Sequence, residues 1–154
     1  MVFTIKPETY SVQLARRIRS FLNGQRRIIR WDDEPGYHLI GRCATTLQKD
    51  GVLWLLTVRA TCQPWLYVNE PTTRNVTMGA AGTITLNLQN ERKRVIPTIV
   101  TSAAVTVVFD GTSTSLNAGT HRVTNIALSY GDNLLTITGA EGTTVLFEYQ
   151  EGAL

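Results

Sequence analysis

Most of this chain alternates apolar and polar residues, and a single segment has the spacing of a helix. Within residues 11–24, SVQLARRIRSFLNG, apolar side chains recur every three or four positions and form one stripe. The members of this stripe are Leu14, Ile18, Phe21 and Leu22. Asn23 and Gly24 then favour the left-handed conformation that ends many helices. The pattern predicts a helix over this segment, with Thr9 or Ser11 as its N-terminal cap.

The segments around this helix have the two-residue period of strands. Residues 3–5 and the basic run RRIIRW at residues 26–31 each predict a short strand. Residues 37–48 and 52–63 predict the two arms of a long hairpin, closed by a turn at residues 49–51 that contains Asp-Gly.

The same hairpin decides how the two cysteines are interpreted. With this turn, the numbers of opposite residues sum to about 100, so Cys43 lies across from Thr57 and Cys62 across from His38. At that register the thiols are too far apart for a disulfide, and we expect both to be free and buried.

The chain changes character after Tyr67. Residues 68–73, VNEPTT, have the composition of a linker, so we place a domain boundary between residues 1–67 and residues 68–154. Seven short Thr/Val/Ile runs with glycine turns follow, at residues 82–88, 95–101, 105–110, 112–116, 121–128, 134–138 and 143–149. This spacing predicts an antiparallel β-sandwich. The expected fold class is mainly β with one α-helix: a partial domain of helix and β-hairpin, followed by the sandwich.

Charge is distributed unevenly between these two parts. Residues 1–67 contain ten Lys/Arg and five Asp/Glu, a net charge of +5, whereas residues 68–154 contain five and seven, a net charge of −2. Six arginines lie close together in the first part: Arg16, Arg17, Arg19, Arg26, Arg27 and Arg30. Three interpretations remain open: a solvated cationic face, a contact surface for an acidic protein such as a neighbouring copy, and nucleic-acid binding, although no recognised motif surrounds the cluster.

Few residues suggest catalysis or metal binding. The acidic turn at residues 32–36, DDEPG, lacks the spaced oxygen ligands of a calcium loop, and we expect no metal or cofactor. We interpret His38 as structural, and no pattern in the sequence pairs His121 with Cys62 or with a serine. Glu148 and Glu151 define no pair across a cleft. We expect a protein that is not an enzyme.

No window of the sequence is long and apolar enough for a membrane helix, and the start, MVFTIKPETY, lacks the pattern of a secretory signal. We therefore expect the protein in the cytoplasm, or in a particle assembled there, without a membrane partner.

Several stretches, in this order, resemble one family. The helix SVQLARRIRSFLNG, the segment DDEPGYHLIGRC and the strand ending TCQPWLY resemble the later part of the N-terminal domain in distal tail proteins of phages with long non-contractile tails, and of related prophages. LNLQNERKRVIPTIVT, with Pro97 before its Ile/Val run, resembles the first strands of the family's C-terminal galectin-like sandwich. YGDNLLTITGAEGTTVLFEYQEGAL resembles the terminal hairpin of that sandwich. Together these stretches span nearly the whole chain.

The resemblance implies a structural role in a virion tail. Copies of such proteins form a ring, commonly a hexamer, in the baseplate hub between the tail tube and the tail tip, and they contact the tube protein and a tail-tip or tail-associated protein. It also implies that several dozen N-terminal residues of the family are missing here, so we expect a fragment or shortened chain. Assembly takes place in the cytoplasm of the bacterial host.

The resemblance assigns roles to two groups of residues. The arginine cluster becomes a candidate subunit or tail-tube interface. The segment at residues 57–67 becomes the exit from the ring-forming domain, with candidate inter-domain packing by Cys62, Pro64, Trp65 and Tyr67.

Two alternatives come from other classes of protein. Galectin-like sandwiches often bind sugars, which makes a carbohydrate-binding module for host recognition the second hypothesis. Tyr130, in a turn, is the candidate sugar platform. Nucleic-acid binding through the basic helix is the third, and we expect no nucleic-acid partner.

Overall fold

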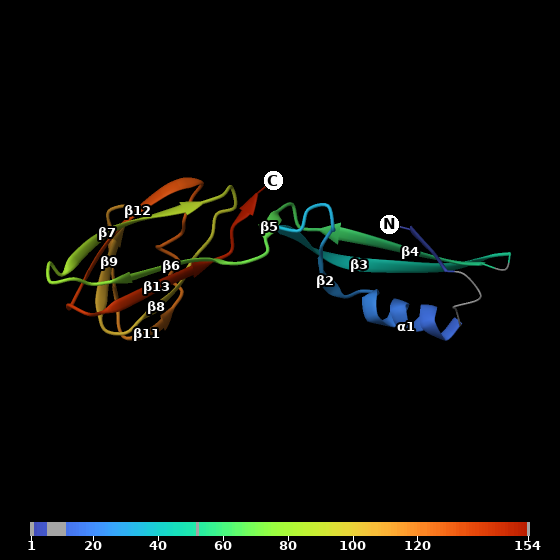
Figure 1. The fold of residues 1–154 in the computed structure, drawn as a ribbon, viewed down its shortest axis with the longest axis horizontal. Coiled ribbons are helices and arrows are strands. Elements are labelled where there is room, and N and C mark those ends of the chain that lie inside the picture. The colour runs from blue at the N-terminus through green and yellow to red at the C-terminus, as the bar shows by residue number, and fades with distance from the viewer. Residues whose placement is uncertain (1, 6–11, 52, 154) are drawn as a thin grey trace. The chain divides into compact units, whose positions relative to one another are not determined.

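The computed structural model describes residues 2–5, 12–51 and 53–153 of the chain (Figure 1). Contacts divide the chain into two compact units, Met1–Trp65 and Leu66–Leu154. This division falls two residues before the boundary predicted from the linker composition, because Leu66 and Tyr67 already pair with strand residues near the C-terminus. None of the helices in the described ranges is long and apolar enough to cross a membrane.

The first unit is an antiparallel sheet with one helix against it. Its elements are β1 (Val2–Ile5), α1 (Val12–Leu22), β2 (Arg26–Ile29), β3 (Tyr37–Asp50) and β4 (Leu53–Cys62). The strand order is β1-β4-β3-β2, with β3 and β4 as the predicted long hairpin. The predicted cap residues Thr9 and Ser11 lie outside the described residues.

The end of α1 is attached to β3, as the helix-stop prediction requires. Gly24 has the positive φ of 73° expected after a helix. The Asn23 side-chain oxygen Oδ1 accepts a hydrogen bond from the Thr45 backbone amide at 3.0 Å, and the Gly24 amide donates to the Cys43 carbonyl at 2.8 Å. The helix is therefore fixed over the face of β3 that carries Cys43 and Thr45.

The predicted helix is observed, and its apolar stripe is only partly buried. Ala15 is fully buried, while Ile18 and Leu22 are half-buried. Leu14 and Phe21 are 40% and 62% exposed. The helix thus buries a small side chain and half-buries two larger ones, and it leaves the large apolar side chains of Leu14 and Phe21 exposed.

The hairpin register differs from the predicted one by three residues. Pairing continues to Asp50 and Leu53 at the turn, so Cys43 lies across from Ala60 and Cys62 across from Gly41. Both cysteines are free, as predicted, although only Cys43 is buried and Cys62 is half-buried. The prediction had centred the turn too early, on residues 49–51.

The second unit is the predicted antiparallel β-sandwich. Two four-stranded sheets have the orders β10-β9-β12-β7 and β11-β8-β13-β6, and β5 pairs with β14 beside them. The strands are β5 (Leu66–Val68), β6 (Thr72–Thr77), β7 (Thr83–Asn90), β8 (Thr98–Thr101), β9 (Val105–Phe109), β10 (Thr112–Leu116), β11 (Gly119–His121), β12 (Gly131–Gly139), β13 (Thr144–Tyr149) and β14 (Gly152–Ala153). A mainly β fold with one helix is confirmed for the described residues.

Two details of the strand prediction for this unit are wrong. The segment assigned to a linker, residues 68–73, contains the last residue of β5 and the start of β6. The polar sequence TTRNVT of β6 forms an edge strand and so lacks a strong apolar signal. The strand predicted over residues 121–128 ends at His121, and Leu128 meets Val95 only in an isolated bridge.

The inward side chains of both sheets and apolar residues of the connecting segments form one core. Its fully or nearly fully buried members are Met78, Leu88, Val95, Ile99, Val105, Val107, Leu116, Ile126, Leu128, Leu135, Ile137, Val145, Phe147 and Tyr149. The Tyr149 hydroxyl donates to the Gln89 carbonyl at 2.5 Å, so the polar end of this buried ring has a partner. Burial also raises the pKa of Tyr149.

Phe147→Ala should destabilise the sandwich by about 3–5 kcal/mol, because the substitution leaves a cavity where the ring is fully buried. Differential scanning calorimetry of the full chain measures this as a lower melting temperature. Leu134→Ala is the matched control: Leu134 is 65% exposed, and its loss should change the stability by less than about 0.5 kcal/mol. Equal effects of the two substitutions would contradict the assigned core.

Candidate functional site

The observed register gives the sheet of the first unit two chemically different faces. Opposite residues share a face, so Thr45 pairs with Val58 and Cys43 with Ala60 on the side against α1. On the other side, Arg42 pairs directly with Arg26 on β2, and Arg59 lies across from Ala44. We call Arg26, Arg42 and Arg59, all exposed, the arginine face.

The structure does not bring the six predicted arginines together. Arg16, Arg17 and Arg19 are exposed on α1, and Arg30 follows the end of β2. Arg26 and Arg27 are neighbours on β2 and therefore point to opposite faces of the sheet. The predicted cluster thus divides into separate surfaces.

Arg27 has a structural role within the unit. Its guanidinium carbon lies 3.9 Å from the centroid of the Phe21 ring, and its Nη2 donates to the Phe21 carbonyl at 2.5 Å. This carbonyl belongs to the last turn of α1, where backbone acceptors have no partner within the helix. Arg27 therefore secures the end of the helix.

Sequence reasoning missed Arg42 and Arg59. Both arginines are visible in the sequence of the hairpin arms, but they share one face of the sheet only in the observed register. The register predicted from the turn would have set them on opposite faces, because a shift by an odd number of residues turns one arm over.

The arginine face has excess positive charge. Arg26 and Arg42 are like charges directly opposite each other, an arrangement that destabilises a sheet. Arg42 donates to the Gly24 carbonyl at 3.0 Å, but among the described side chains no carboxylate forms an ion pair with any of the three. The acidic turn between β2 and β3, with Asp32, Asp33 and Glu34, is fully available because all three residues are exposed.

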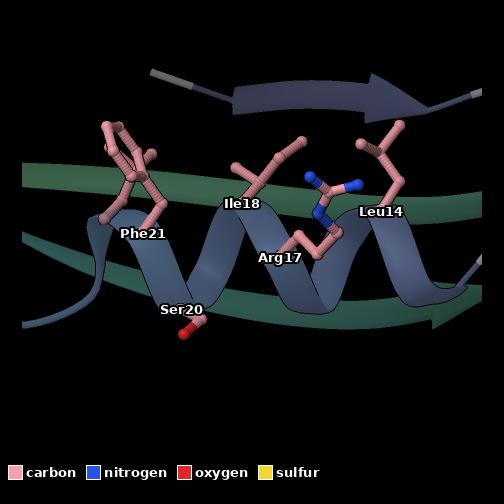
Figure 2. A pocket seen from close by; sticks show the side chains of 6 residues that line it. Leu14, Arg17, Ile18, Ser20 and Phe21 are labelled. Atoms are coloured by element: carbon pink, nitrogen blue, oxygen red, sulfur yellow. The ribbon is translucent and has the colours of Figure 1, made fainter.

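Two apolar grooves lie on the helix side of this unit. The first, about 770 Å³, runs along α1 and is lined by Leu14, Arg17, Ile18, Ser20, Phe21 and Leu22. Figure 2 shows Leu14, Ile18 and Phe21 projecting from the same side of the helix, while Ser20 points away from them. The second, about 690 Å³, lies beyond the end of the helix, and its lining includes Ile29, Leu39 and Cys62. Ile28 also borders it and is 57% exposed.

The four residues assigned to inter-domain packing have separate surroundings. Cys62 lines the second groove, Pro64 is exposed and Trp65 is half-buried. Tyr67 is buried in the second unit, where the Lys93 ammonium lies 4.7 Å from the centroid of its ring. Burial, together with the nearby charge of Arg122, lowers the pKa of Lys93. Packing between the units by these residues stays a prediction.

Tyr130 lies in a polar part of the sandwich. It is 72% exposed and lines a groove of about 310 Å³ together with polar residues of β6 and β7. No group of three or more His, Cys, Asp or Glu residues in the described part of the chain is arranged to hold a metal ion.

Arg27→Ala should destabilise the first unit by about 1–2 kcal/mol, since it removes a charged hydrogen bond and the contact with Phe21. All three tryptophans of the chain, Trp31, Trp54 and Trp65, belong to this unit, so tryptophan fluorescence during urea unfolding reports on it. Arg26→Ala is the control and should leave the midpoint unchanged or raise it slightly, because it removes the like charge opposite Arg42. A larger loss for Arg26→Ala than for Arg27→Ala would refute the assignment.

Comparison with known proteins gives a likeness in fold. No family model matches the chain, and no curated protein matches it. Among solved structures, the chain is similar to the crystal structure of SPP1 Dit (gp 19.1), described as a paradigm of the hub adsorption apparatus in phages that infect Gram-positive bacteria. The TM-score is 0.56 at 19% sequence identity, and the match covers 97% of this chain and 76% of that chain. This chain therefore has a Dit-like fold across both of its units.

Proposed function

We propose that this protein is a structural, non-enzymatic component of a phage or prophage tail, the distal tail protein of the baseplate hub. The observation that carries the proposal is the likeness to SPP1 Dit over 97% of the chain, which extends across the helix-and-hairpin unit as well as the sandwich. A β-sandwich alone occurs in many classes of protein, whereas this pair of units in this order is far more restrictive. The protein would belong to the virion tail and assemble in the host cytoplasm.

In this role, copies of the first unit form a ring, commonly a hexamer, that joins the tail tube to a tail-tip or tail-associated protein. The exposed apolar side chains of this unit support an assembly role, because soluble monomers rarely leave grooves and large apolar residues uncovered together. The partner at the subunit contact is a second copy of the chain.

Charge complementarity suggests how the copies meet. The arginine face lacks carboxylate partners among the described residues, and the acidic turn at residues 32–34 is exposed on the same unit. Docking the turn of one copy on the arginine face of the next would neutralise Arg26 opposite Arg42. Such a contact is heterologous, and repeated contacts of this type close into a ring when the rotation fits.

Reversing charge on one side should break the assembly, and reversing both sides should restore it. We expect Arg26→Glu with Arg59→Glu to weaken self-association at least roughly tenfold, and Asp32→Lys with Asp33→Lys to do the same. Combining all four substitutions recreates opposite charges across the contact. Light scattering after size-exclusion chromatography measures the mass of each variant.

Arg92→Glu with Arg94→Glu is the matched control, since both arginines are exposed in the second unit. Assembly should survive this change. A chain that stays monomeric at every concentration would contradict ring formation. An assembly that tolerates either reversal, or that the four-residue swap does not restore, would place the contact elsewhere.

A further inference from the structure

A polar groove in the sandwich unit combines an exposed aromatic ring with charged groups of both signs. Its volume is about 310 Å³, near the lower limit for small-molecule sites. Tyr130 lines it, together with Arg74, Gln89, Glu91, Asp132 and Glu151. A tyrosine exposed to 72% gains little from burial in the fold, so most of its ring remains open to a partner.

The turn that carries Tyr130 is held rigidly by one buried side chain. Asn133 Nδ2 donates to the carbonyls of Ser129 and Gly131, each at 2.9 Å, and its Oδ1 accepts from the Ser129 amide at 2.8 Å. The same Nδ2 reaches the Leu88 carbonyl on β7 at 3.1 Å, and Gly131 supplies the positive φ of 87°. Tyr130 is therefore pre-positioned, and a ligand does not have to order the turn.

The carboxylates beside Tyr130 are also fixed before any ligand arrives. Asp132 Oδ1 accepts hydrogen bonds from Asn87 Nδ2 at 2.7 Å and Gln89 Nε2 at 3.2 Å, and these bonds lower the pKa of Asp132. Its second oxygen has no hydrogen-bond partner among the described residues. The Glu151 carboxylate accepts from the Thr72 hydroxyl. The groove thus presents oriented carboxylate oxygens that can accept further hydrogen bonds from a ligand.

A buried oxygen at the same groove is unsatisfied. Asn90 lines the groove and is only 4% exposed, and its Nδ2 donates to the carbonyls of Lys93, Leu128 and Ser129. Its Oδ1 has no hydrogen-bond partner among the described residues. A buried acceptor without a donor is costly, so this end of the sandwich has an uncompensated polar atom in a residue that lines the groove.

The chemistry of the lining selects the class of ligand. Three carboxylates against one guanidinium disfavour an anion. A bare metal ion lacks a suitable group of ligands among the described residues. Alcohol groups can donate to the carboxylates and accept from Arg74 in one ligand. The C–H groups on one face of a sugar ring can pack on the electron-rich face of tyrosine.

We propose that this groove binds the terminal unit of a neutral carbohydrate, with one face of a hexose ring on Tyr130 and its hydroxyls hydrogen-bonded to the polar lining. This site is independent of the subunit contact proposed above, because it uses residues of the sandwich alone.

Saturation-transfer NMR on the full chain tests the site with defined probes: the methyl glycosides of glucose, galactose, mannose and N-acetylglucosamine, at millimolar concentration. At least one should receive saturation, and titration gives its affinity. Tyr130→Ala should weaken that affinity about tenfold through loss of the ring face, whereas Tyr130→Trp should retain it. Leu134→Ala removes a similarly exposed apolar residue on β12 and should have no effect.

The melting temperature of each variant shows that the sandwich is still folded. Glucose 6-phosphate, sialic acid and a lysine-rich peptide serve as charged probes. Binding of a charged probe without any neutral sugar would overturn the proposal. So would the absence of saturation for all four glycosides, or an affinity that Tyr130→Ala leaves unchanged.

Discussion

The pairing register of β3 with β4 is the constraint on which the chemistry of the first unit depends. Because side chains alternate along a strand, this register decides that Cys43 lies with Ala60 under the helix and that Arg42 shares the outer face with Arg59. The helix reinforces the choice, since Asn23 bonds only to the Thr45 side of β3. One pairing therefore produces both a helix-covered apolar face and a cationic face, and neither could be changed without the other.

In the second unit, buried amides have the equivalent role. Asn133 and Asn90 are each only 4% exposed, and a buried amide without hydrogen bonds would destabilise the fold. Both are held by backbone carbonyls around residues 128–131, so the connection into β12 has one conformation rather than many. The apolar core makes the sandwich stable, while these amides fix the shape of its polar end. Because the amides fix the connection into β12, the groove beside Tyr130 has a defined shape.

The sequence was sufficient where local chemistry determines structure. The helix end at Asn23-Gly24, the long hairpin and most sandwich strands follow from spacing and turn residues, and all are observed. What it lacked was long-range information. Arg27 was grouped with Arg26, although alternation on β2 separates them and Phe21 engages only one. The polar edge strand β6 has no strong apolar pattern, and the error in register concealed that Arg42 and Arg59 share a face.

Tyr130 could be singled out from the sequence as an aromatic residue in a turn. Its polar neighbours come from β6, β7 and the C-terminal segment, which only the fold brings together.

The two proposed contacts differ in the force that sustains them, and salt separates them. A contact between exposed arginines and an exposed acidic turn is screened within about 8–10 Å at physiological ionic strength, so added salt should weaken it markedly. An uncharged sugar brings no charge that salt could screen, so its binding through hydrogen bonds and ring stacking should depend little on ionic strength. Raising the ionic strength should therefore dissociate the subunits while leaving sugar binding in place. Loss of both together would mean that the groove depends on assembly, which the separation of their residues between two units argues against.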